Sequence, residues 1–146
     1  MKNDLDSGLL LEKARAVFAA DKYLMLTGVR IDEVGADSCR CSLVVEPQHM
    51  NAGGAAQGGA VYTLADSAFA VACNIGHLER GEALITVSQS ASISYLRAVP
   101  LGAKLEAFAQ KVGGGKRSSV YRIDVTAEDG KPVATMTGNA VTVPKR

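Results

Sequence analysis

The segment 58–75 constrains the fold more than any other part of this sequence, because its side chains are apolar nearly all the way round a helix. A helix of this kind has to be buried on most of its sides, and a sheet wrapped around it would bury it. Asp66 is the single formal charge between Glu46 and Glu79 and lies in the middle of the segment. A membrane span needs about 20 mostly apolar residues without such a charge, so we expect a buried core helix and no membrane association.

Hydrophobic spacing and turn residues predict the other elements. A helix is expected over 7–20, with Asp6 or Ser7 as its N-cap, inside an N-terminal helical segment of residues 1–28. Strands are expected over 29–34, 38–45, 84–98, 103–112, 117–127 and 132–143. Because short turns join the last four strands, they predict an antiparallel meander. The pattern favours an α+β fold, and the 146 residues fit a single domain over 1–146.

Alternation along two strands predicts which side chains share a face. In the strand 84–98 the apolar set is Ile85, Val87, Ala91, Ile93 and Tyr95, and the polar set on the opposite face is Ser88, Ser90, Ser92 and Ser94. Cys39 and Cys41 share one face of an earlier strand, and they and Cys73 are expected to be small core residues. His77 is expected in solvent, just beyond the end of the central helix.

Composition and charge argue against several classes of protein. The formal net charge is +1 and the Lys and Arg residues are scattered, so the chain lacks the basic face of a nucleic-acid-binding protein. Two histidines at no recognised spacing predict no metal site. An odd number of cysteines and a start without the pattern of an export signal favour a reducing, cytoplasmic location.

Asp66 and the pair Gly58–Gly59 are the residues at which we expect chemistry. A carboxylate among apolar side chains is costly, and proteins usually tolerate that cost for a partner charge, a metal or catalysis. The start of the helix at Gly58 offers backbone N–H groups without intrahelical partners, and a partial positive charge. Two plain alternatives stay open at this point. In the first, Asp66 is a structural acid bonded to neighbouring Ser and Thr residues. In the second, the two glycines form only a tight turn.

The run from His49 to Gly59 (HMNAGGAAQGG), which continues to Leu64–Ala68 (LADSA), resembles the signature of hotdog-fold acyl-CoA thioesterases, in particular the phenylacetic acid degradation group. The resemblance implies an antiparallel sheet of five or six strands around the central helix. It also implies homodimers joined edge to edge, often paired into homotetramers. The implied reaction is hydrolysis of an acyl-CoA to a free acid and CoA. No metal or prosthetic group is implied, since CoA is part of the substrate.

The same resemblance implies roles for individual residues. Asp66 becomes the nucleophile or the general base, and the amides of Gly58 and Gly59 become the oxyanion hole. Asn51 matches an asparagine that positions water or the substrate carbonyl. Ser88 matches a Ser or Thr that helps to hold the water near the acid.

Gln57 departs from the group, most of whose members have a histidine immediately before the glycine pair. Its amide can still orient other groups through hydrogen bonds, but it cannot transfer a proton. His49 also lies in the motif and is expected to be structural or peripheral.

The spacing of Gly58 and Asp66 predicts a dimer. The two residues are eight positions apart (66 − 58), which is about 12 Å along a helix axis. Both groups need to lie within about 3 Å of one reacting carbonyl or its water. One helix cannot satisfy this requirement, but two antiparallel helices can. We therefore expect an active site shared across a two-fold interface, with two sites per dimer.

The phosphates of CoA also need binding groups. The turn 113–117 (GGGKR) resembles the turn near the nucleotide end in this group, which implies Lys116 and Arg117 as CoA-binding residues, with Arg97 as a further candidate. For Lys116 and Arg117 the alternative is a solvated turn. For the whole protein the alternative is an acyl-CoA sensor without catalytic activity. A hotdog hydratase is less favoured, because Val71 stands where its Asp-x-x-x-x-His pattern requires histidine.

Overall fold

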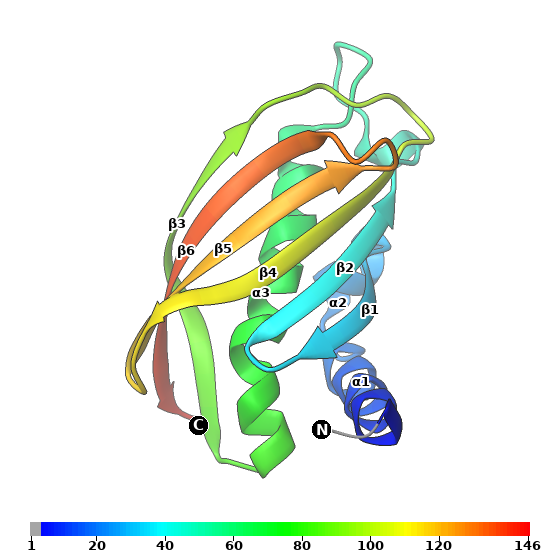
Figure 1. The fold of residues 1–146 in the computed structure, drawn as a ribbon. Helices are drawn as coiled ribbons and strands as arrows, with labels where there is room; N and C mark the ends of the chain where they lie inside the picture. Colours follow the sequence, from blue (N-terminus) through cyan, green and yellow to red (C-terminus); the bar gives the residue numbers. More distant parts are fainter. Residues whose placement is uncertain (1–3) are drawn as a thin grey trace.

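A curved sheet of six antiparallel strands wraps around one long helix, α3 (Gly58–Arg80), in the computed structural model, which describes residues 4–146 (Figure 1). Across the sheet the strands follow the order β1 (Arg30–Gly35), β2 (Ser38–Val44), β4 (Lys104–Gly114), β5 (Ser118–Ala127), β6 (Pro132–Pro144) and β3 (Leu84–Tyr95). The α+β class and the helix-wrapping sheet expected from the sequence are confirmed.

The middle of α3 forms the core together with the inner face of the sheet. Leu64 and Phe69 are at most 1% exposed. The ring of Phe69 packs at a tilt against Tyr121 of β5, with the ring centroids 5.4 Å apart, and it also lies directly over Gly138 of β6. No helix within residues 4–146 is long and apolar enough to cross a membrane.

Helix α3 continues past residue 75 to Arg80 and is capped by Gly81, whose φ of 64° is a left-handed conformation that glycine adopts readily. His77 therefore lies inside the helix, and the expectation of a solvated residue beyond its end is wrong. The cause is tertiary. The Asn74 side chain accepts a hydrogen bond from the Thr86 amide and donates one to the Thr86 carbonyl, both at 2.8 Å. These two bonds hold the last turns of α3 against β3.

Strands β3 and β4 are not neighbours, so the predicted meander of four strands is wrong for its first member. β3 pairs with β6, and β4 pairs with β2. The connection between them runs beside the end of β2. There the Gly102 amide donates to the Val45 carbonyl and the Val45 amide donates to the Ala103 carbonyl, both at 2.8 Å. Together with the burial of Val99, these bonds carry the chain across the end of the sheet.

A β-bulge interrupts β3. The register with β6 shifts between Ser88 and Ser90, which leaves Gln89 as the additional residue. Before the bulge Thr86 is buried and its neighbours Ile85 and Val87 are exposed, whereas after it the core contacts are made by Ala91 and Ile93. The prediction that Ile85 and Val87 share a face with Ala91 and Ile93 is therefore wrong, because one inserted residue exchanges the two faces of a strand.

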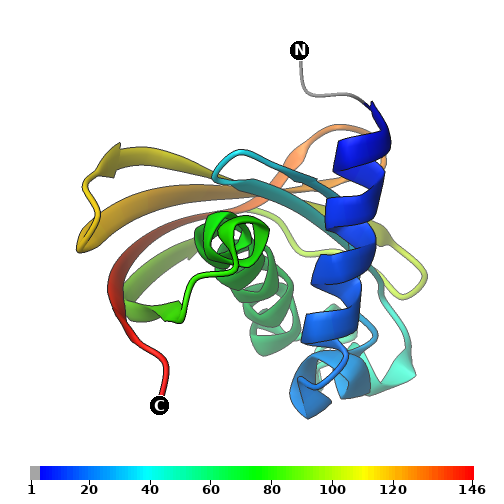
Figure 2. The same ribbon diagram turned by 90° about the horizontal axis from the view of Figure 1, so that it is seen from below.

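The N-terminal part of the described chain forms two helices, α1 (Asp4–Phe18) and α2 (Lys22–Thr27), rather than the single helix expected over 7–20. Helix α1 lies beside α3 and against β1 (Figure 2). Ala14 is fully buried there, and Arg15 Nε donates to the Ile31 carbonyl at 2.8 Å. Asp21 separates the helices because its side chain caps α2. The segment thus forms one wall of the space beside α3.

Candidate active site

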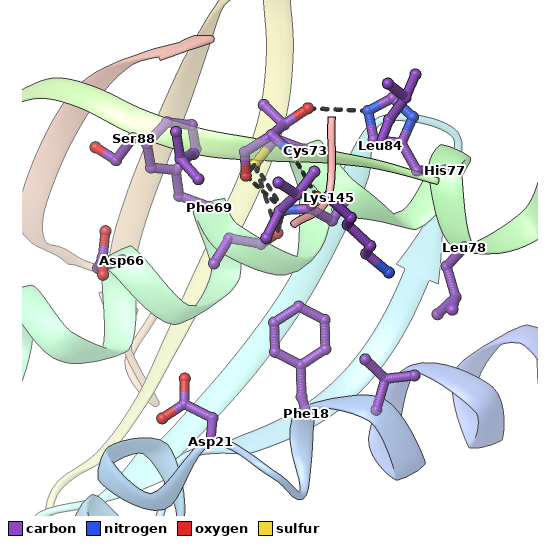
Figure 3. Close-up of a pocket in the computed structure, with 16 residues that line it drawn as sticks. Phe18, Asp21, Asp66, Phe69, Cys73, His77, Leu78, Leu84, Ser88 and Lys145 are labelled. Carbon is purple, nitrogen blue, oxygen red and sulfur yellow. Dashed lines mark hydrogen bonds between the residues drawn. The ribbon is translucent and has the colours of Figure 1, made fainter. Parts of the chain in front are cut away.

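Asp66 lies half-buried at one end of a cavity of about 400 Å³ between α1, α3 and β3 (Figure 3). Ser88 borders the same end, and His77 lies at the other. The walls between them are mostly apolar and include Phe18, Phe69, Leu78, Leu84, Ile85 and Val87. Burial among these side chains raises the pKa of Asp66, and the negative charge of Asp21 raises it further. The three cysteines are buried, as expected.

Within residues 4–146 the Asp66 carboxylate has neither a hydrogen-bond partner nor an ion-pair partner. The neighbouring hydroxyls bond elsewhere: Thr63 Oγ1 donates to the Gly59 carbonyl at 2.8 Å, and Ser67 Oγ donates to the Thr63 carbonyl at 2.6 Å. A structural acid would be satisfied by such groups. This unpartnered carboxylate at the edge of an apolar cavity instead has the environment of a reactive group.

Gln57 caps the start of α3, where its side-chain Oε1 accepts a hydrogen bond from the Gly59 amide. The Gly58 amide has no partner within the described part of the chain. A Cβ at Gly58 would lie 3.2 Å from Cζ of Tyr95, whose hydroxyl donates to the Gly58 carbonyl at 3.0 Å. In a single chain the open donor at this helix start is therefore Gly58, while the Gly59 amide is occupied.

Asn51 shapes the loop that precedes α3. Its Oδ1 accepts hydrogen bonds from the amides of Gly53 and Ala55, at 2.9 Å and 3.1 Å. His49 is buried behind this loop. Its Nε2 donates to the Thr27 carbonyl at 2.8 Å, and its Nδ1 accepts from the amide of Glu46 at 2.9 Å. These bonds give the ring a structural role.

The structure thus divides the expected catalytic residues into two groups within one chain. Asp66 and Ser88 border the cavity, whereas Asn51, Gln57 and the glycine pair gather at the start of α3. Because Gly58 and Asp66 lie on the same continuous helix, about 12 Å separates them along its axis.

The three candidate CoA-binding cations are also separated. Lys116 lines a second cavity, of about 710 Å³, together with Lys111, and Arg117 adjoins it in the β4–β5 turn. Arg97 pairs with both carboxylate oxygens of Asp129, at 2.7 Å and 3.0 Å, beside the β5–β6 turn. β5 lies between these two turns, which are about 30 Å apart along a strand of this length.

Two residues to which the sequence assigns no role in the site border these cavities. His77 lines both of them: its Nδ1 contacts Glu82 Oε2 at 2.7 Å, and its Nε2 contacts Thr86 Oγ1 at 2.9 Å. Asp21 borders the cavity from the α1–α2 junction. A capping signal ahead of α2 marks Asp21 in the sequence, but nothing local places it opposite α3. No group of three or more His, Cys, Asp or Glu residues within 4–146 is arranged to hold a metal ion.

Comparison with known proteins identifies the family. The thioesterase superfamily matches residues 53–134. The acyl-coenzyme A thioesterase PaaI of Escherichia coli is 30% identical over 129 residues, which cover 88% of this chain and 88% of that protein. The solved structure of the E. coli PaaI protein has a TM-score of 0.83 and 28% identity, covering 93% of this chain and 97% of that one. A mutant structure of the phenylacetic acid degradation protein PaaI from Thermus thermophilus has a TM-score of 0.73 and 34% identity, covering 82% and 96%. The chain therefore belongs to the thioesterase superfamily, the thioester hydrolases of the hotdog fold.

Proposed function

We propose that the protein hydrolyses an acyl-CoA to a free acid and CoA, with Asp66 as the nucleophile or the general base. The observation that carries the proposal is the unpartnered, half-buried Asp66 carboxylate at the edge of an apolar cavity. The apolar walls suit an acyl group, and a thioester carbonyl at the Asp66 end would lie beside the acid. The similarity to a protein named as an acyl-coenzyme A thioesterase supports the same substrate class.

The reaction needs a base and a place for negative charge. As a base, Asp66 takes a proton from water while the water oxygen bonds to the thioester carbon; the C–S bond then breaks and CoA leaves as its thiol. As a nucleophile, the carboxylate itself adds to the carbonyl carbon, the C–S bond breaks to release CoA and leave a mixed anhydride, and water then hydrolyses that anhydride to the free acid and regenerates the carboxylate. Either route develops an oxyanion that a backbone N–H at a helix start stabilises. A raised pKa makes Asp66 a stronger base at the pH where it is ionised.

The oxyanion donor is proposed to come from a second copy of the chain. The Gly58 amide is unpartnered, and Gln57 supports it by occupying the neighbouring Gly59 amide and fixing the helix start. Strand β3 is an edge of the sheet and exposes Ile85 and Val87. Antiparallel pairing of two such edges would align two α3 helices so that each Asp66 meets the other copy's helix start. The resemblance predicts further pairing into tetramers.

The same pairing suggests where the phosphates of CoA bind. Lys116 and Arg117 adjoin the second cavity, which shares Cys73, His77, Leu84 and Thr86 with the cavity of Asp66. Antiparallel β3 edges would bring Arg97 of the second copy, just after the end of its β3, toward the start of β3 in the first. Lys116 and Arg117 of one copy and Arg97 of the other would then meet around one nucleotide. Asn51 and Ser88 are proposed to hold the water or the carbonyl.

A thiol-release assay over a panel of acyl-CoA substrates tests the activity. We expect the wild type to cleave at least one ester, and Asp66→Asn to lose a hundredfold or more of kcat/KM. Glu12→Gln, which removes an exposed carboxylate of α1, is the control and should keep full activity. Equal cleavage by Asp66→Asn would overturn the mechanism. Binding of CoA esters without cleavage of any would favour the sensor alternative.

A proline substitution tests the oxyanion donor. Gly58→Pro deletes the amide hydrogen at the first helical position, where proline is well tolerated. The backbone of Gln57, at φ −66° and ψ 135°, already suits a following proline. Gly58→Ala is the matched control, because it brings a Cβ against Tyr95 but keeps the N–H. We expect a loss of about a hundredfold for proline beyond that of alanine.

Mixing the two inactive variants tests the shared site. A dimer of Asp66→Asn with Gly58→Pro has one site with both defects and one site with neither. Random exchange of subunits should restore about a quarter of the wild-type activity. A mixture that exchanges subunits and stays inactive would show that each chain supplies both groups.

A further inference from the structure

We propose that Asp21, at the junction of α1 and α2, is a positioning residue that places a second negative charge across the cavity from Asp66 and so sets the pH range in which the enzyme works. This inference rests on the proposed function, since it concerns the ionisation of the acid proposed there. Asp21 lies outside the region 53–134 that the thioesterase superfamily matches.

Asp21 and Asp66 line the same two cavities. Asp21 and Asp66 both border the cavity of about 400 Å³, and both border a smaller one of about 320 Å³ next to Gly59 and Tyr62. Figure 3 shows them on different elements that border the cavity, with Asp66 on α3 and Asp21 between α1 and α2, where it caps α2. A substrate in this cavity would therefore lie near both acids.

Asp21 is held in place rather than free to turn away. Its Oδ1 accepts a hydrogen bond from the Leu24 amide at 2.9 Å, which caps α2. Its backbone is tied on both sides, since its amide donates to the Phe18 carbonyl at 3.0 Å and its carbonyl accepts from the Met25 amide at 3.1 Å. The cap thus fixes a charge on the wall opposite Asp66.

Among the described residues, Asp21 is the one other carboxylic acid on the walls of the two cavities that Asp66 borders. The remaining titratable groups on these cavity walls come from α2, α3 and the C-terminal end, and are Tyr23, Tyr62, Cys73, His77 and Lys145. Burial, followed by the charge of Asp21, raises the pKa of Asp66. A like charge disfavours the ionised form, so its removal should let Asp66 ionise at lower pH. Because Asp21 is exposed, salt should screen its effect.

Asp21→Asn isolates the charge. Asparagine caps a helix as well as aspartate does, so the bond to the Leu24 amide is kept while the charge is lost. The direct measurement is a carbon-13 NMR titration of the Asp66 carboxyl, assigned by the loss of its signal in Asp66→Asn. We expect a lower midpoint in Asp21→Asn than in the wild type. Glu12→Gln removes a charge from α1 away from both cavities and should leave the midpoint unchanged.

The acidic limb of kcat/KM against pH should move in the same direction. At the pH where the wild type keeps half of its plateau value, Asp21→Asn should keep about three quarters, as expected for one like charge across a partly solvated cleft. Adding salt to about 1 M should lower the wild-type midpoint and leave that of Asp21→Asn in place.

The outcomes separate the two proposals. Equal NMR midpoints in Asp21→Asn and the wild type would overturn the role of Asp21, while a strong loss in Asp66→Asn would leave the proposed function intact. A lower NMR midpoint with an unmoved kinetic limb would also overturn it, because Asp21 would then not set the working range. Full activity of Asp66→Asn would instead refute the proposed function.

Discussion

Replacing Gly138 by alanine is expected to destabilise the fold through a single contact. A Cβ at this position of β6 would lie 2.6 Å from Cε1 and 2.7 Å from Cζ of Phe69. Carbon atoms pack best at about 3.5–4.0 Å, so the ring would have to withdraw by about 1 Å. It has little room, because Phe69 is 1% exposed and packs against Tyr121, which is 2% exposed.

The expected cost follows from this lack of room. Overpacking of a well-filled core costs about 1–3 kcal/mol, and we expect about 2 kcal/mol for Gly138→Ala. A chain of this length unfolds with an entropy of about 0.3 kcal/mol/K, so Tm should fall by about 6 °C. The urea midpoint should fall while the m-value stays constant, measured at one fixed protein concentration because of the expected dimer.

A second substitution tests whether Phe69 is the cause. Phe69→Leu alone should cost about 1 kcal/mol, but in the Gly138→Ala background it should cost less or even stabilise, because leucine frees space for the new methyl group. Gly113→Ala is the control: a Cβ there meets nothing within 4 Å, so the change should stay within about 0.5 kcal/mol. A double variant that shows the simple sum of the two single effects would refute the argument.

Three further outcomes are expected. Hydrogen bonds from Arg80 and His77 lower the pKa of the Glu82 carboxyl to about 2, below its unfolded value of about 4.5. The small contribution of Glu82 to stability is therefore present above pH 4.5 and is lost as the pH falls toward 2. In acid titrations the difference in stability between wild type and Glu82→Gln should disappear over that range. Burial raises the pKa of Cys73 to about 12, and all three thiols are buried. At pH 8 the native protein should therefore react with a thiol reagent far more slowly than the urea-unfolded chain, which exposes three thiols. His49→Ala should cost about 1–3 kcal/mol in urea unfolding, because it leaves two partly buried backbone groups, the Thr27 carbonyl and the Glu46 amide, without their partners. A midpoint equal to wild type would contradict this structural role.

The central helix and most of the strands are predictable from local patterns, whereas the limits of α3 and the order of the sheet are not. The apolar run fixes the middle of α3, but Gly76 looks like a place to stop. The helix continues because Asn74 bonds to Thr86, a residue distant in sequence. The position of β3 beside β6 likewise depends on the connection that packs against Val45, and turn residues alone do not determine such pairings.

Some features of the candidate site are likewise predictable from the sequence, and others are not. Asp66 is visible in the sequence because a single charge interrupts an apolar segment. The capping of the Gly59 amide by Gln57 is not, since glutamine is not a favoured N-cap residue. Asp21 has a local capping signal, but its place opposite Asp66 follows only from how α1 packs on α3.

The extra residue in β3 also affects how roles are carried from one thioesterase to another. Gln89 shifts the strand by one position. The residues of β3 that face the core therefore have even numbers before Gln89 and odd numbers after it. An alignment that slips by one place here would pair the serine of a relative with Gln89 and would reverse inside and outside for half of the strand. Deleting Gln89 would do the same to the protein itself, turning Thr86 outward and away from its bonds to His77 and Thr142. Strand length at this point is therefore as strictly determined as residue type.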